Sequence, residues 1–148
     1  MIRLSRTNSD HPEFIRLTAL LDDELCMIYN THKADYEEYN RITGLPTVVL
    51  ASNQNTAVAC GCFKIIDDTT IEIKRMFVDP AFRNKGIASA IVGELEKWAK
   101  ESGYEHAILE TGTGQPEAIA MYRKLGYSVI DDDLYASSER SVCMKKKL

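Results

Sequence analysis

Apolar and polar positions near the start of the chain follow two different periods. From residue 14 to 28 the apolar residues recur every three or four positions, as in a helix with one buried face: Phe14, Leu17, Leu20, Leu21, Leu25 and Ile28. The stretch Ser9-Asp10-His11-Pro12-Glu13 before them supplies a capping residue and a proline for the first turn. A weak alternation over Ile2 to Arg6 precedes the stretch. The pattern predicts a strand followed by an amphipathic helix.

Three runs rich in apolar and β-branched residues come next. They are Thr47 to Ser52, Ala57 to Ile66 and Thr70 to Val78. Asparagine- and aspartate-rich turns separate the runs, and Pro80 ends the third. We therefore expect a meander of three antiparallel strands. The polar and aromatic segment before it, Thr31 to Gly44, predicts a short helix or a structured loop.

Helical and strand periods alternate in the second half of the chain. Gly86 to Ser102 places its apolar residues on one helical face, and Gly103 ends the helix. The remaining predicted elements are a strand at His106 to Glu110, a helix at Pro116 to Leu125, and strands at Tyr127 to Ile130 and Ser141 to Lys147.

This order of elements predicts an α+β fold. A strand meander followed by strand–helix–strand implies a mixed sheet of six to seven strands, flanked by about four helices. The crossover from Val78 to Ala107 should be parallel and right-handed. At 148 residues we expect one domain, 1–148, large enough to bury roughly 70% of its unfolded surface.

Composition excludes several classes of protein. A net charge of −4 argues against nucleic-acid binding, which usually requires a basic patch. No signal-peptide pattern opens the chain and no apolar run could span a bilayer, so we expect a cytoplasmic protein without a membrane partner. The four cysteines are scattered and the three histidines lie far from them, which predicts reduced, structural cysteines and no metal site.

The segment Arg83-Asn84-Lys85-Gly86-Ile87-Ala88 carries the clearest chemical signal. It has the form R-x-x-G-x-A and opens the long predicted helix. Backbone N–H groups in the first turn of a helix lack intrahelical partners, and the helix dipole makes this end attractive to anions. Arg83 and Lys85 add positive charge. The segment therefore predicts a pyrophosphate site, against the alternative of a tight turn with two solvated bases.

The spacing of glycines narrows the choice of nucleotide. A Walker A loop requires G-x-x-x-x-G-K-[ST], and a dinucleotide fold requires G-x-G-x-x-G early in the chain; neither pattern is present. Coenzyme A remains, with its pyrophosphate on the loop and its pantetheine arm along a strand.

Several motifs together resemble the GNAT acetyltransferase superfamily. Val78-Asp79-Pro80 followed by Arg83-x-x-Gly86-x-Ala88 is similar to the acetyl-CoA signature of that family. Two further motifs resemble the downstream helix and strand signature of the family, namely Gln115-x-x-Ala118 and the run from Met121 to Tyr127. The resemblance covers residues 72–130 in its motifs and 1–66 in element order only. It implies a GNAT-like fold and acetyl-CoA as acetyl donor.

The resemblance implies a set of cofactor-binding residues. The pyrophosphate would lie on the backbone amides of Arg83, Asn84, Lys85, Gly86, Ile87 and Ala88. The pantetheine amides would pair with the backbone of Met76, Phe77 and Val78, where the family also provides a strand amide as oxyanion donor. Gln115 stands where many members have an asparagine.

Two catalytic residues are implied as well. Glu72, 11 residues before Arg83, has the spacing of the glutamate general base. On an unbroken strand it would share a face with Lys74 and Met76, whereas a bulge would redirect it. Tyr122 falls where the family places the acid that faces the departing thiolate. The alternatives are a half-exposed polar residue for Glu72 and a core aromatic for Tyr122.

The acceptor side of the expected site is less specified. An amine acceptor could be attracted by acidic residues and bound among tyrosines, although solvated surfaces and packing explain them equally well: Asp22, Asp23, Glu24, Asp35, Glu37, Glu38, Asp131 to Asp133, Tyr36, Tyr39 and Tyr135. We expect direct transfer to the primary amine of a small metabolite or amino-acid-like compound. A protein or peptide amine acetyltransferase and a non-catalytic acyl-CoA sensor are the alternatives. The oligomeric state stays open, a homodimer included.

Overall fold

A seven-stranded mixed sheet forms the centre of the protein. The computed structural model describes residues 1–30, 44–130 and 141–148. Within them the strand order is β1-β2-β3-β4-β5-β7-β6, and only β4 and β5 pair in parallel. The strands are β1 (Ile2–Thr7), β2 (Val48–Asn53), β3 (Thr56–Ile65), β4 (Thr70–Val78), β5 (His106–Gly112), β6 (Ser128–Val129) and β7 (Ser141–Lys147). The predicted meander, the parallel β4–β5 pair and the closing strand pair are confirmed.

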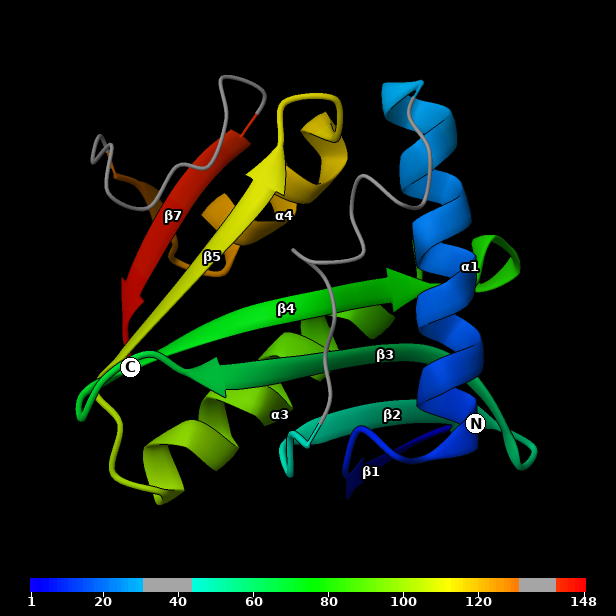
Figure 1. Ribbon diagram of the computed structural model, residues 1–148, viewed down its shortest axis with the longest axis horizontal. Coiled ribbons are helices and arrows are strands. Elements are labelled where there is room, and N and C mark those ends of the chain that lie inside the picture. Colours follow the sequence, from blue (N-terminus) through cyan, green and yellow to red (C-terminus); the bar gives the residue numbers. More distant parts are fainter. Residues whose placement is uncertain (31–43, 131–140) are drawn as a thin grey trace.

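Helices cover both faces of the sheet. Helix α1 (Pro12–Tyr29) lies on one face, while α3 (Ile87–Glu101) and α4 (Pro116–Lys124) lie on the other (Figure 1). The α3 face holds the larger core, to which β4 contributes Ile71 and Ile73. The α1 face holds a smaller core, which includes Cys60, Cys62 and Phe77. Alternate residues of each central strand supply the two cores because successive side chains point to opposite faces.

Helix α1 begins with a cap that differs from the usual Ser or Asp. His11 is the N-cap, and its Nδ1 accepts a hydrogen bond of 3.1 Å from the Glu13 N–H. Ser9 pairs instead with Leu45: the two exchange bonds of 2.9 and 3.0 Å through the Ser9 N–H and Oγ. Ser9 therefore anchors the chain to the start of the meander.

The number of helices is slightly lower than expected. The described residues contain three α-helices and a 3-10 turn, η2 (Pro80–Phe82), where about four helices were predicted. The candidate helix or loop at residues 31–43 lies outside the described residues, as do Asp35, Tyr36 and the acidic run 131–133. Among the described helices, none is both long enough and apolar enough to span a membrane.

Candidate active site

Strands β4 and β5 part half-way along their length. They pair from Thr70 with His106 to Ile73 with Leu109, yet β4 continues to Val78 and β5 to Gly112 (Figure 1). Strand β5 remains paired with β7 throughout, whereas the β5-facing edge of β4 beyond Ile73 has no strand partner among the described residues. A cleft of about 1160 Å³ lies there, lined by both strands and by residues of α1, α3 and α4.

A β-bulge marks the place where the strands part. The register with β3 shifts between Cys60 and Cys62, and Arg75 has the left-handed φ of 58°. The bulge interrupts the alternation of side chains, because Lys74 and the next residue, Arg75, both lie on the α1 face. Arg75 points toward α1, whereas Met76 packs against the core on the α3 face. A Cβ on Gly61 would collide with Met76 Sδ and would lie 2.9 Å from Ile91 Cγ2. Gly61 thus provides the space for Met76.

The bulge decides whether Glu72 and Met76 lie on the same face of the sheet. Because Ile71 and Ile73 lie in the α3-face core, Glu72 between them points to the α1 face. Met76 is on the opposite face, so the strand follows the bulge alternative given above, and the bulge redirects Met76 and not Glu72. Lys74 keeps the face of Glu72, since it lies before the bulge.

The second half of β4 presents backbone groups to the cleft. Asp79 donates its N–H to Val58 O on β3 at 2.8 Å. Since amides alternate in direction along a strand, those of Met76 and Val78 point away from β3, toward the opening. Phe77 buries its side chain in the α1-face core. As far as the described residues show, the amides of Met76 and Val78 therefore face an opening that suits a ligand in extended conformation.

The loop after β4 leads directly into α3. Asp79 caps η2 by accepting the Ala81 N–H at 2.9 Å, and Asn84 and Gly86 both have left-handed φ values, 63° and 78°. Gly86 is the N-cap of α3 and provides no side-chain cap. The N–H groups of Ile87 and Ala88 are thus the donors at an open helix N-terminus.

The two basic residues of the loop are held by neighbouring groups. The Arg83 guanidinium donates to Val78 O at 2.9 Å and to Glu24 Oε2 on α1 at 2.6 Å, so its charge is shared with α1. Lys85 Nζ lies 5.3 Å from the Phe82 ring centre. Lys85 does not line the cleft, whereas the other eleven predicted site residues do.

Glu72 is half-buried at the point where the strands part. Burial raises its pKa, and Glu110 on β5 adds to the rise, while Lys74 and Lys64 oppose it. A carboxylate with a raised pKa is a better match to the proton of an alkylammonium than an ordinary one.

Tyr122 lies on α4 and is 5% exposed. Its ring packs edge-to-face on Tyr127 at 5.8 Å, and burial raises its pKa. It belongs to the α3-face core and also lines the cleft, so the two interpretations of this residue are compatible. The phenol stays protonated at neutral pH and is a hydrogen-bond donor.

Gln115 is the N-cap residue of α4 and accepts a hydrogen bond of 3.4 Å from the Tyr29 hydroxyl. Tyr29 lines the cleft and packs against the β5–α4 turn, because a Cβ on Gly112 would strike its hydroxyl and one on Gly114 would lie 3.1 Å from its Cε1. Sequence reasoning missed Tyr29, Arg75 and Glu110 as cleft residues. The two nearby glycines of the β5–α4 turn were the available signal for Tyr29.

The cysteines and carboxylates give little support for other chemistry. Burial raises the pKa of Cys60 to about 12 and also raises that of Cys62, which disfavours a thiolate nucleophile. Within the described ranges, no group of three or more His, Cys, Asp or Glu residues is arranged to hold a metal ion. Asp22 and Glu24, considered above for attracting an amine, instead pair with Arg75 and Arg83.

The splayed strands, the open helix N-terminus and the motifs on them agree with a known family. The model of the acetyltransferase (GNAT) family matches residues 14–127. The chain belongs to this family.

Individual relatives match parts of the chain or its fold. Human N-acetyltransferase 8 is 34% identical over 84 residues, which are 53% of this chain and 37% of that protein, so the match spans little more than a third of that relative. A structure from Klebsiella pneumoniae, provisionally assigned as an acyl-CoA N-acyltransferase, is 29% identical with a TM-score of 0.81, over 100% of this chain and 98% of that one. A GNAT acetyltransferase from Elizabethkingia anophelis, solved with acetyl-CoA bound, is 19% identical with a TM-score of 0.72, over 99% and 98%.

Proposed function

We propose that the protein is an acetyl-CoA-dependent N-acetyltransferase. It transfers an acetyl group to the primary amine of a small metabolite or amino-acid-like acceptor, directly within a ternary complex. The observation that carries the proposal is the continuity of the cleft: the free edge of β4 leads straight to the open N-terminus of α3.

The diphosphate of acetyl-CoA matches the open N-terminus of α3, and its pantetheine arm matches the edge of β4. The backbone N–H groups of residues 83–88 donate hydrogen bonds to the diphosphate, whose negative charge is favoured by the helix dipole. The Met76 C=O and the Val78 N–H pair with the pantetheine arm as a further strand would, and the Met76 N–H is left for the thioester carbonyl. The acetyl-CoA complex of the Elizabethkingia anophelis relative, which shares this fold, supports the choice of donor.

Glu72 and a β4 amide serve the acyl transfer. The amine nitrogen attacks the thioester carbonyl, the carbon–sulfur bond breaks, and the amine proton passes to Glu72 directly or through water. A model alkylammonium and a model glutamate differ by about 6 pKa units, so the raised pKa of Glu72 reduces the barrier to this transfer. The β4 amide stabilises the oxyanion.

Tyr122 serves the leaving thiolate. A phenol near pKa 10 is already a weaker acid than a thiol near 8.5, and burial raises the pKa of Tyr122 further. Full proton transfer is therefore uphill, and we assign to the Tyr122 hydroxyl a hydrogen bond to sulfur. The proton that finally neutralises the thiolate comes from solvent.

The test is acetyl-CoA titration by calorimetry, followed by a mass screen of amines and peptides for the gain of one acetyl group. We expect saturable binding, and acetylation of small amines in preference to peptides. Acetylation of peptides alone would replace the acceptor class, and binding without thiol release would favour a sensor. Absence of binding at millimolar acetyl-CoA would overturn the proposal. Tyr122→Phe should bind coenzyme A normally and turn over more slowly.

A further inference from the structure

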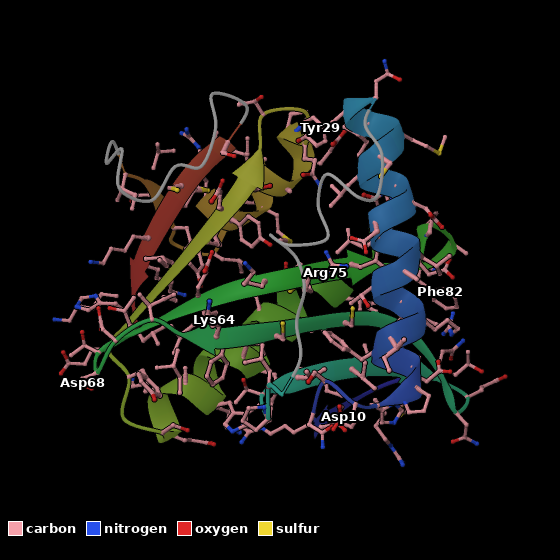
Figure 2. The ribbon with its side chains drawn as sticks, in the orientation of Figure 1. Asp10, Tyr29, Lys64, Asp68, Arg75 and Phe82 are labelled. Atoms are coloured by element: carbon pink, nitrogen blue, oxygen red, sulfur yellow. The ribbon has the colours of Figure 1, made fainter. Side chains whose placement is uncertain are left out.

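The bulge in β4 is fixed by an ion pair with α1. Arg75 donates from one guanidinium nitrogen to Asp22 Oδ1 at 2.8 Å and to Thr18 O at 2.9 Å. The Arg75 side chain is 4% exposed and that of Asp22 31%. Figure 2 shows Arg75 at the centre of the molecule, between β4 and α1.

Arg75 combines two unfavourable features. Its φ of 58° is a left-handed conformation that a residue with a long side chain seldom adopts. A buried guanidinium is stable only when it is paired and hydrogen-bonded. Asp22 and Thr18 O supply these partners, and both belong to the same helix. The docking of α1 therefore compensates for the conformation of the strand.

The conformation of Arg75 determines the orientation of the next residue, Met76. The extra residue of the bulge turns Met76 to the α3 face, into the space beside Gly61. It also sets the direction of the Met76 amide, which faces the opening between β4 and β5. The register on either side of the bulge is fixed, by Lys74 with Cys62 before it and Phe77 with Cys60 after it. The direction of the Met76 N–H therefore depends on the conformation of Arg75.

We propose that the Arg75–Asp22 ion pair is a positioning element for the acyl-transfer step. By holding the bulge, it keeps the Met76 amide aimed at the thioester carbonyl, without touching the substrate itself. This inference rests on the proposed function. It concerns the transfer step and leaves the binding of the diphosphate to the separate loop at residues 83–88.

The variant Asp22→Asn tests the pair with the least disturbance, because it keeps an acceptor oxygen and removes the charge. We expect kcat to fall roughly tenfold, as for a misaligned oxyanion donor. The Kd of coenzyme A should change less than about twofold, since its diphosphate site is separate. The variant Arg75→Met should show a larger fall in kcat, again with little change in the Kd of coenzyme A. The matched control is Glu101→Gln, which weakens an ion pair with Arg6 away from the cleft and should leave kcat unchanged.

The outcomes separate the inference from the function on which it rests. Wild-type kcat in Asp22→Asn and Arg75→Met, with or without a lower melting temperature, would reduce the pair to a structural contact. An equal loss of coenzyme A affinity and of kcat would also overturn the inference, because the whole cleft would then depend on the pair. If Arg75→Met does not fold, the Asp22→Asn result decides. Failure of the wild-type protein to bind acetyl-CoA would instead overturn the proposed function.

Discussion

The two halves of β4 belong to one continuous strand, but they differ in the strands with which they pair. From Thr70 to Ile73 the strand is paired on both edges, with β3 and with β5. Beyond the bulge at Arg75, Phe77 and Val78 pair with β3, and within the described ranges no strand pairs with their other edge, which lines the cleft. The comparison teaches that one strand carries both a structural segment and a candidate binding segment, separated by one inserted residue.

The difference has an energetic reason. Backbone N–H and C=O groups that are removed from water and left without a partner cost about 1–3 kcal/mol each. The paired half satisfies its groups within the sheet, so it needs nothing from a ligand. In the second half the Met76 and Val78 N–H groups face the cleft, where an extended ligand rich in amides can satisfy them, whereas Val78 O already accepts from Arg83. Changes in the first half should therefore affect stability, and changes in the second should affect binding.

The largest effect is expected at Glu72, which lies at the junction of the two halves. Glu72→Gln should lower kcat by roughly 10²–10⁴-fold, the usual contribution of a general base. The Kd of acetyl-CoA should remain that of the wild type, measured by calorimetry. An unchanged kcat would leave Glu72 as a polar strand residue and remove the junction from the chemistry.

The same variant has an expected pH signature. The raised pKa means that folded Glu72 binds its proton more tightly than unfolded Glu72, near 4.3. Its contribution to stability is therefore present below the unfolded pKa and is lost as pH rises through the folded pKa. Thermal melts of Glu72→Gln should match the wild type at low pH and should lie at or above it at pH 7. The acid limb of kcat/KM should disappear together with the carboxylate.

Proline substitutions compare the two halves most directly. Ile73→Pro removes an N–H that has a partner on whichever edge it faces, so we expect a loss of about 3 kcal/mol or more in the free energy of unfolding. Val78→Pro removes an amide that faces the cleft and should fold, as prolines at free strand edges do. It should bind acetyl-CoA more weakly. Equal destabilisation by both prolines, in denaturant melts, would contradict the distinction between the halves.

A smaller effect is expected at Gly61, opposite the bulge. Gly61→Ala crowds Met76 and Ile91 and should lower the free energy of unfolding by about 1–3 kcal/mol, the usual cost of overpacking. Adding Met76→Ala should recover part of this loss in a double-mutant cycle. Gly93→Ala is the matched control, because its added Cβ would meet no atom within 4 Å apart from its chain neighbours and the adjacent backbone of its own helix, and the helix should gain slightly. Additive losses at Gly61 and Met76 would show that the two do not share the space.

The smallest effect is expected at Gly86, where a comparison with Gly103 distinguishes a role of the 83–88 loop in binding from backbone strain alone. Gly86 and Gly103 flank α3, both have left-handed φ values, and both have open space at the Cβ position. Alanine at either position should cost about 1–2 kcal/mol. Only Gly86→Ala should also weaken acetyl-CoA binding several-fold in calorimetry, because it strains the loop that carries the donor amides. Equal affinities for the two variants would move the diphosphate away from this loop.

Patterns that involve consecutive residues were sufficient for much of the fold. The apolar spacing of Gly86 to Ser102 predicted α3 (Ile87–Glu101) to within a residue at each end. The asparagine- and aspartate-rich turns predicted the meander, and the motif of residues 83–88 predicted the candidate phosphate site. The parallel β4–β5 pair followed from the strand–helix–strand order of the elements. These features are local because they depend on backbone torsions and on which face of one element is apolar.

Contacts between distant residues were decided only by the tertiary structure. The sequence assigned the charge of Arg83 to the phosphate loop, but that side chain pairs with Glu24, 59 positions away. Arg75 pairs with Asp22 at a separation of 53, and this docking supports the bulge that moved Met76 away from Glu72. The sequence by itself determined the elements, the family and the candidate groups. The tertiary structure decided their faces and partners, because one inserted strand residue reverses the alternation of side chains, and its left-handed conformation depends on a helix that packs across the sheet.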